Sequence, residues 1–290
     1  MSQNINLINW NITGGSHLPF NGSITETLKL SCNLGMSACQ FFLGNPKSFN
    51  RSKISIQDLD DSRHIQDRFC INCFSHAPYI YNLCGSKSSL CWNGDLIQDQ
   101  KTLQVIKSLE YEMDIMGHLG GAVVIHPGCY TDRNMGIETI VKTLDRINFK
   151  PHHQLLLENC AGQGDTLGTT VKELRQMLNT KNYKNVGICI DTAHLWGVGE
   201  YDISTIRGVE KLFTALDKEE CLGKMKLLHL NDSKVQYGAR KDLHELIAKG
   251  NIWSKDQSSL RVLLDKLDKL RIPFILETCP TDFQQVYKLN

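Results

Sequence analysis

Six apolar runs in this sequence each end on a side chain of a type that binds divalent metal ions. Runs such as AVVIH, QLLLE and VGICID are apolar up to their last residue, which is typical of strands buried on both faces. The six terminal residues are His76, His126, Glu158, Asp191, His229 and Glu277. One such residue alone is usually structural, but six together predict a metal site around the edge where the strands end.

Three further residues of ligand type follow in predicted loops. His194 lies three residues after Asp191 in the sequence DTAH, and Asp242 and His244 alternate in the sequence DLH. In an extended segment this alternation places both side chains on one face, which suits two ligands of one ion. The resulting nine ligands exceed the roughly four that a zinc ion takes. The sequence therefore predicts two or three ions that share bridging carboxylates.

The elements that must position these residues alternate between strand and helix along the whole chain. One segment has helical spacing, with apolar residues or threonine at positions 102, 105, 106, 109, 113 and 116. The β-rich runs cover residues 7–13, 37–43, 69–76, 121–126, 154–158, 186–191, 226–231 and 273–277. Eight such units predict an α/β fold: a single (β/α)8 TIM barrel over residues 1–290, with the metal site at the C-terminal face of the strands.

The composition is that of an ordinary globular protein, with 41% hydrophobic and 22% charged residues and a formal net charge of +1. No window has the apolar length of a membrane span, and the N-terminus lacks the basic and apolar regions of a secretory signal. We therefore expect an intracellular protein, cytoplasmic or nuclear, without a membrane partner. The 11 cysteines are predicted to be mostly buried thiols, including the CxxC pair Cys70 and Cys73, while Cys84 and Cys91 could approach each other.

Several longer motifs resemble one known family. They are HPG at 126–128, LLLENCAGQG at 155–164, IDTAHLWGVGEYD at 190–202, HLNDSKVQYGARKDLHELIAKGNI at 229–252 and ILET at 275–278. In these motifs the chain resembles the endonuclease IV family of apurinic/apyrimidinic (AP) endonucleases. The resemblance implies a TIM barrel with three zinc ions that acts in DNA base excision repair. It also implies hydrolysis of double-stranded DNA on the 5′ side of an abasic site, which leaves a 3′-hydroxyl and a 5′-deoxyribose phosphate.

The same resemblance implies how the ligands are divided. It assigns one ion to His76, His126 and Glu158, with Glu158 bridging to a second ion. The second ion would be bound by Asp191, His229 and Glu277, and the third by His194, Asp242 and His244. Manganese is an alternative to zinc at one site, because histidine and carboxylate ligands accept both. The ions would act as Lewis acids in place of a protein base, with Glu158 bridging and Glu277 orienting the water.

The resemblance also implies contacts to DNA. Tyr79 and Ile80, in HAPYI, match residues that enter the duplex, and Lys47, in GNPKSF, stands where the family has arginine. Lysine keeps the charge but loses the planar surface for stacking. Leu243, in KDLH, replaces a second arginine. Basic residues of the seventh loop that we expect to contact phosphate are Lys234, Arg240 and Lys241. A histidine after the first strand, His17, is expected to support the site by hydrogen bonding, and the protein is expected to be a monomer.

Two alternatives remain open at this level. Metal-dependent sugar isomerases and epimerases share the barrel and place Glu, Asp and His at its mouth, although a small polyol requires neither a ninth ligand nor a basic seventh loop. A non-catalytic DNA-binding relic would be recognised by lost ligands, and each position implied by the resemblance carries a ligand type here.

Overall fold

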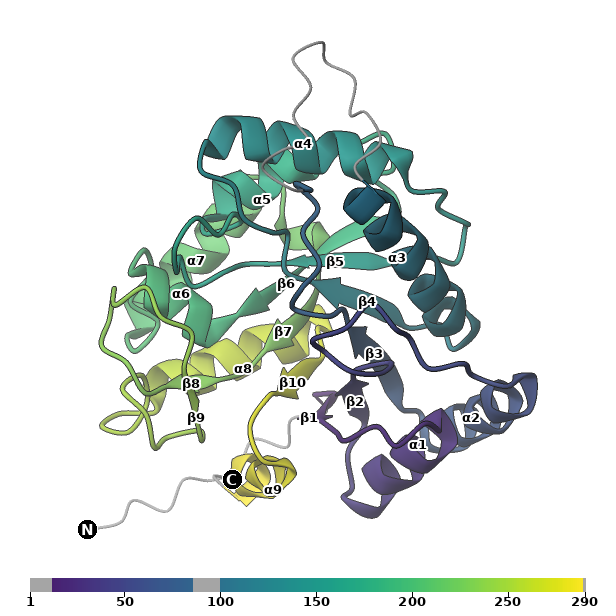
Figure 1. Cartoon of the computed structure of the whole chain (residues 1–290). Helices are drawn as coiled ribbons and strands as arrows, with labels where there is room; N and C mark the ends of the chain where they lie inside the picture. Colours follow the sequence, from purple (N-terminus) through teal and green to yellow (C-terminus); the bar gives the residue numbers. More distant parts are fainter. Residues whose placement is uncertain (1–11, 86–99, 289–290) are drawn as a thin grey trace.

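The computed structural model of the chain describes residues 12–85 and 100–288. Within these ranges, parallel strands close into an eight-stranded barrel in the order β1-β2-β3-β4-β5-β6-β7-β10, which confirms the predicted TIM barrel (Figure 1). The barrel strands are β1 (Gly14–His17), β2 (Ala38–Phe41), β3 (Asn72–His76), β4 (Ala122–Ile125), β5 (Leu155–Glu158), β6 (Val186–Asp191), β7 (Met225–His229) and β10 (Phe274–Leu276).

Helices connect the strands and cover the outside of the barrel (Figure 1). Several begin at a Ser, Thr or Asp whose side chain accepts a hydrogen bond from an amide of the first turn, as Ser55 does at α2 and Thr205 at α7. The helices are α1 (Ile24–Asn33), α2 (Ile56–Phe69), α3 (Gln100–His118), α4 (Arg133–Arg146), α5 (Val171–Met177), α6 (Thr192–Val198), α7 (Ile206–Lys218), α8 (Ser258–Leu270) and α9 (Pro280–Lys288), with a 3-10 turn η1 (Leu222–Lys224). Among the described residues, no helix has the length and apolarity that crossing a bilayer requires.

A small antiparallel pair stands apart from the barrel. β8 (Asp232–Ser233) follows β7, and β9 (His244–Glu245) pairs with it, so that Ser233 faces His244. The segment between the two strands carries the basic residues of the seventh loop. Because β9 pairs with β8, which directly follows β7, the hairpin brings Asp242 and His244 back to the mouth of the barrel.

The first strand was predicted at residues 7–13, but residues 12 and 13, the described part of that range, are not in a strand. Residues 1–11 lie outside the described residues, and the strand is instead the following GGSH sequence of β1. Gly15 pairs with Ala38 of β2, and a Cβ atom on Gly15 would lie 1.6 Å from the carbonyl oxygen of Ala38. This strand is therefore not marked by apolar side chains, because its neighbours leave no room for them.

The predicted start of the third strand is also wrong by several residues. Helix α2 continues to Phe69, and Cys70 ends it in the left-handed conformation with φ 53°. The strand begins only at Asn72, so Cys70 and Cys73 belong to different elements and do not form a redox or metal pair. The ten cysteines in the described ranges are free thiols. Cys91 and most of the predicted loop at residues 85–94 lie outside the described residues, so the suggested approach of Cys84 to Cys91 stays a prediction.

Candidate metal centre

The ligand-type residues occupy one layer inside the barrel. Below them lies a separate apolar cluster formed only by barrel strands: Ala38, Phe74, Ala122, Val124, Leu156, Cys189, Leu227 and Ile275. Because side chains alternate along a strand, a residue two positions further points to the same face. The matching pairs are Phe74 and His76, Val124 and His126, Leu156 and Glu158, Cys189 and Asp191, Leu227 and His229, and Ile275 and Glu277. The strand geometry therefore gathers six ligand types directly above the apolar interior.

The first group of potential ligands brings together His76, His126 and Glu158, the residues that the resemblance assigns to one ion. Their potential ligand atoms all lie within 4.8 Å of one another. The Oε2 atom of Glu158 is 3.1 Å from Nε2 of His76 and 3.0 Å from Nε2 of His126. Glu158 is fully buried, whereas the His126 side chain retains 27% of its exposure and faces the mouth. The Oε2 atom of Glu158 thus lies within hydrogen-bonding distance of both imidazole rings.

The second group shares Glu158 with the first. It consists of Glu158, Asp191, His229 and Glu277, whose ligand atoms again lie within 4.8 Å. The other carboxylate oxygen of Glu158, Oε1, is 2.7 Å from Nδ1 of His229, and that nitrogen is 3.3 Å from Oε2 of Glu277. The two oxygens of Glu158 therefore face two different groups, which is the arrangement that a bridging carboxylate needs.

The third group differs from the expected set in one respect. His194 and His244 lie together with Asp191, so Asp191 belongs to both the second and the third group. Asp242, which was expected here, bridges the two histidines: its oxygens are 3.1 Å from Nε2 of His194 and 3.0 Å from Nε2 of His244. Asp191 ends β6 and also caps α6 by accepting the amide of His194, which explains why residues three apart meet.

Sequence reasoning missed two neutral residues that hold these ligands. Gln40, fully buried, donates to Oε1 of Glu277 at 2.8 Å, and its own oxygen lies 2.9 Å from Nε2 of His229. Asn231 donates to Asp191 at 2.6 Å and to Glu277 at 3.2 Å. A signal for Gln40 was present, because it lies two residues beyond Ala38 of the inner layer, as the ligands do in their strands.

His17 also supports the centre. Its Nδ1 atom is 3.1 Å from Nε2 of Gln40, and its ring packs 4.6 Å from that of Phe42. Burial lowers the pKa of His17 to about 4, although the charge of Glu277 opposes this shift. His17 is therefore a neutral imidazole that accepts from Gln40, in agreement with the expected supporting role.

Charges within the buried layer shift the pKa values of its members strongly. Burial by itself would lower the pKa of His194, but the negative charges of Asp191 and Asp242 outweigh burial and raise the pKa well above its ordinary value. Conversely, burial would raise the pKa of Glu158, but the neighbouring His229 and His126 hold it well below its ordinary value. At Glu158 and His194 the opposite charges thus stabilise the charged form, whereas at Asp191 burial outweighs the neighbouring histidines and raises the pKa.

The donor set fits divalent ions. His76 and His194 each have Nδ1 2.7 Å from a backbone carbonyl oxygen, which directs Nε2 toward the mouth in the way typical of metal-binding histidines. Nε2 of His194 and Nε2 of His244 lie close to Asp242, yet neither is hydrogen-bonded to any described residue. Ligand atoms about 2.0–2.2 Å from a tetrahedral ion are roughly 3.3 Å apart. The N···O separations of 2.7 to 3.3 Å in the first two groups lie near this value, and in the third group Asp191 is 3.9 Å from His194 and 3.7 Å from His244.

A further His and Asp cluster lies away from this layer. Asp114, His152 and His153 have potential ligand atoms within 4.8 Å of one another. The carboxylate of Asp114 is already hydrogen-bonded to the ammonium group of Lys150, and the same oxygen lies 2.8 Å from His153. A cation at this cluster would meet the lysine charge, so we regard the cluster as an ion-pair network on the outside of the barrel.

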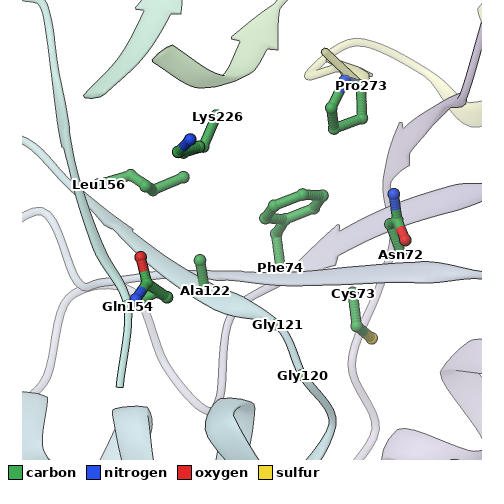
Figure 2. Close-up of a pocket in the computed structure, with 10 residues that line it drawn as sticks. All are labelled: Asn72, Cys73, Phe74, Gly120, Gly121, Ala122, Gln154, Leu156, Lys226 and Pro273. Carbon is green, nitrogen blue, oxygen red and sulfur yellow. The ribbon is translucent and has the colours of Figure 1, made fainter. Parts of the chain in front are cut away.

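A cavity lies at the N-terminal end of the barrel strands, and its lining holds no cluster of potential metal ligands. This cavity, of about 250 Å³, is lined by residues at the start of the strands, including Asn72, Ala122 and Pro273 (Figure 2). Phe74 and Leu156 of the inner layer also line it, with Lys226 at its edge. This cavity is at the opposite end of the strands from the ligand layer. In TIM barrels that end usually serves stability, whereas the C-terminal face carries the active site.

Comparisons with known proteins agree on one family. Residues 28–285 match the family described as the xylose isomerase-like TIM barrel. A protein of Thermosipho melanesiensis named Probable endonuclease 4 is 35% identical to this chain over 274 residues, which cover 91% of each sequence. Another protein of that name, from Halothermothrix orenii, is 30% identical over 91% of this chain and 92% of its own length. The chain belongs to the endonuclease IV family.

Solved structures support this membership, and a sugar epimerase-like structure shares only the fold. Endonuclease IV from Thermus thermophilus matches 96% of this chain and 97% of its own, with a TM-score of 0.78 and 26% identity. A D-tagatose 3-epimerase-like protein matches 95% of both chains with a TM-score of 0.63 and 16% identity, which shows the shared fold alone. As a member of the endonuclease IV family, the chain is a hydrolytic nuclease.

In this endonuclease IV family member, the residues expected to enter DNA lie beside the mouth. Tyr79 is 57% exposed and Ile80 41% exposed, and the two adjacent side chains form an apolar surface there. The Tyr79 ring lies 5.6 Å from the ring of His76 and 6.0 Å from that of His126. Lys47 is exposed in the loop after β2. These residues therefore stand at the rim of the first ligand group.

The expected phosphate contacts lie on the hairpin loop. Lys234, Arg240 and Lys241 are exposed, and Leu243, between two ligand-type residues, is 50% exposed. Arg240 adopts a left-handed backbone conformation with φ 51°, and its amide donates to the carbonyl of Gly197 at 2.8 Å. The backbone of this loop is thereby tied to α6, while its basic side chains remain free to reach solvent.

Proposed function

We propose that this protein is a zinc-dependent AP endonuclease of base excision repair. It would hydrolyse the phosphodiester 5′ to an abasic site in double-stranded DNA and leave a 3′-hydroxyl and a 5′-deoxyribose phosphate. The observation that carries the proposal is the convergence of nine ligand-type side chains into three groups that share Glu158 and Asp191. Relatives named endonuclease 4 and the matching Thermus structure support the same activity.

The chemistry of the donors supports zinc at all three groups. Imidazole nitrogen and carboxylate oxygen are ligands that zinc prefers, and manganese is an alternative at the most carboxylate-rich group. Bound zinc would supply Lewis-acid activation of water near neutral pH and stabilisation of charge on the phosphate. No protein side chain then needs to act as the sole base.

The residues of the chain would bind and orient the reactants. Glu158 would hold two groups at a fixed separation. Glu277, which accepts from Gln40 and Asn231, has its carboxylate locked in place and would orient the attacking water. The oxygen of the water would form the new bond to phosphorus, the bond from phosphorus to the 3′ oxygen would break, and that oxygen would leave with a proton.

Exposed side chains around the mouth support DNA as the substrate. Tyr79 and Ile80 offer apolar surface that can insert at a gap in the base stack, where an abasic nucleotide leaves room. Lys47 on one side, with Lys234, Arg240 and Lys241 on the other, would contact phosphates. Leu243 provides no charge at its place in the rim, so those lysines and Arg240 would carry the electrostatic part of binding.

The proposal is tested by incision of an end-labelled duplex that contains one tetrahydrofuran abasic analogue. We expect cutting on the 5′ side that leaves a 3′-hydroxyl, loss of cutting after a strong chelator, and recovery with zinc. The matched control is the same duplex with an intact nucleotide. Cutting on the 3′ side, or no cutting by metal-loaded protein, would refute the proposal and direct attention to ketose epimerisation. Size-exclusion chromatography with light scattering tests the expected monomer.

A further inference from the structure

A buried arginine lies beneath the rim of the mouth, away from the ligand groups. Arg51 belongs to the loop that follows β2, at residues 42–55, and its side chain is only 4% exposed. Its Nη2 atom donates to the backbone carbonyl oxygens of Asn45 at 2.6 Å and Ser48 at 2.5 Å. These two carbonyls flank Lys47, so one guanidinium group closes the turn that presents this lysine. Both hydrogen bonds come from the single Nη2 atom, which leaves Nη1 of the planar guanidinium group to face a second partner.

The same turn supports the neighbouring rim loop. The amide of Tyr79 donates to the carbonyl of Pro46 at 3.0 Å. The Tyr79 ring also packs edge-on against Phe42, 5.3 Å away, and Phe42 lies 5.4 Å from the His76 ring. Displacement of the turn would therefore move Lys47 directly and would remove a hydrogen bond from Tyr79. The potential ligands at the ends of the barrel strands would stay in place, because the strands do not depend on this turn.

Helix α3 provides the counterpart of Arg51. Glu112 of α3 is fully buried, and its carboxyl group faces Arg51, 3.7 Å from Nη1, which is too long for a hydrogen bond. The preceding residue, Tyr111, has its hydroxyl 2.8 Å from the carbonyl of Ser52 and 3.3 Å from the amide of Ile54. Two consecutive residues of α3 thus hold the loop after β2 against the barrel.

Burial makes this pair costly to keep charged. It raises the pKa of Glu112 to about 8, although the charge of Arg51 opposes this rise. Such a pair contributes little net stability compared with apolar residues of similar volume, whereas loss of one partner alone is destabilising. What the Arg51 side chain determines locally is the turn between Asn45 and Ser48, which carries the candidate DNA contact Lys47.

We propose that Arg51 is a positioning residue for DNA, held by Glu112, which fixes the loop after β2 so that Lys47 and Tyr79 face the lesion together. The inference rests on the proposed function, because it assigns Arg51 to the binding of the same duplex. Arg51 itself touches neither the DNA nor the ligand groups. Its loss is therefore expected to affect substrate binding and to leave the chemical step largely intact.

The test is Arg51→Lys, which keeps the positive charge but replaces the guanidinium by a single nitrogen, so that one atom can no longer face Glu112 while another donates to the carbonyls of Asn45 and Ser48, as Nη1 and Nη2 do. We expect KM for the abasic duplex to rise by about 10-fold or more, which corresponds to about 1.4 kcal/mol of lost binding, while kcat changes less than about threefold. Zinc content should equal that of the wild type. The control is Arg175→Lys, because Arg175 of α5 forms a surface pair at 3.1 Å with Glu220, which follows α7.

A second substitution makes the inference sharper. Lys47→Met should weaken binding in the wild type but add little in the Arg51→Lys background, because the lysine is already misplaced there. Additive effects of the two changes would overturn the inference, and so would an unchanged KM or a loss of zinc together with kcat. Amide hydrogen exchange in the free protein should show residues 43–54 opening faster in Arg51→Lys than in Arg175→Lys.

These readouts separate this inference from the proposed function. If the wild-type protein does not incise the abasic duplex, the proposed function fails. Fluorescence anisotropy with the same duplex then decides the inference alone: weaker binding by Arg51→Lys supports it, and equal binding by both proteins overturns it. If Arg51→Lys does not fold, Arg51→Gln keeps two donors without the charge and is tested in the same assays.

Discussion

Replacement of Glu158 by glutamine is the most direct test of the ligand layer. The two carboxylate oxygens of Glu158 face different groups: Oε2 lies 3.1 and 3.0 Å from the two imidazoles of the first group, and Oε1 lies 2.7 Å from His229. Glutamine preserves the shape but removes the negative charge and one acceptor. Among the described residues of the first group, Glu158 is the one carboxylate, whereas the second group keeps Asp191 and Glu277.

The expected effect can be bounded from these contacts. Changes to residues that only orient a ligand cost about 10-fold to 100-fold in metal affinity or activity, so loss of an anionic ligand should exceed 100-fold at the first group. The protein should therefore lose about one equivalent of metal. Incision should fall by at least about 1000-fold, or roughly 4 kcal/mol in the activation free energy, because water far from an ion has a pKa near 15.7 rather than about 7.

The assay combines metal content by mass spectrometry with single-turnover incision of the abasic duplex. Glu173→Gln is the matched control, because this carboxylate pairs with Arg133 at 2.6 Å, outside the three ligand groups, and its loss should leave metal content unchanged. A Glu158→Gln protein with full metal content and the wild-type rate would refute the bridging assignment. Full metal content with a lost rate would instead restrict Glu158 to the chemical step.

Other expected outcomes test the support of the centre and the fold. Gln40→Ala removes the partner of both His229 and Glu277 and should weaken zinc binding by about 10-fold to 100-fold in competition with a chelator. Gly15→Ala places a Cβ 1.6 Å from a carbonyl oxygen of β2 and should cost about 3 kcal/mol or more in urea unfolding, whereas Gly223→Ala, with open space around it, should cost less than about 0.5 kcal/mol. Burial opposes the charged form of Asp58, but hydrogen bonds from Ser23 and the start of α1 lower its pKa below 3.8. Its carboxylate therefore stabilises the fold above pH 3.8 and ceases to do so as the pH falls through the lowered pKa, so Asp58→Asn should cost about 1 kcal/mol or less at pH 7 at this partly exposed site, and the difference should shrink as the pH falls below 3.8.

Much of the ligand layer was predictable because of one regularity. A buried parallel strand is apolar along its length, so a charged or imidazole side chain at its end stands out. Glu158 and Asp191 end β5 and β6 in this way, and the same alternation places them above Leu156 and Cys189. The residue types and their spacing were thus sufficient to predict the barrel and to locate the six residues at the strand ends.

The same reasoning failed where side chains are small or neutral. β1 begins with two glycines because the neighbouring strands leave no space there, so no apolar run marks it. Gln40 and Asn231 carry no charge and were not singled out, although Asn231 lies within the motif at 229–252 and both residues hold Glu277 in place. Arg51 was not recognised at all, because its role depends on contacts with α3, which is distant in the sequence.

The sequence by itself determined which residue types stand at the ends of the strands, since that depends on periodicity and burial along each strand. Only the tertiary structure decided how those residues combine. Asp191 belongs to two ligand groups because β6 passes directly into α6, so that one carboxylate faces both His194 and the neighbouring His229. Such sharing depends on the closure of the barrel and on the angle between strand and helix, which bring together atoms that no spacing along the chain relates.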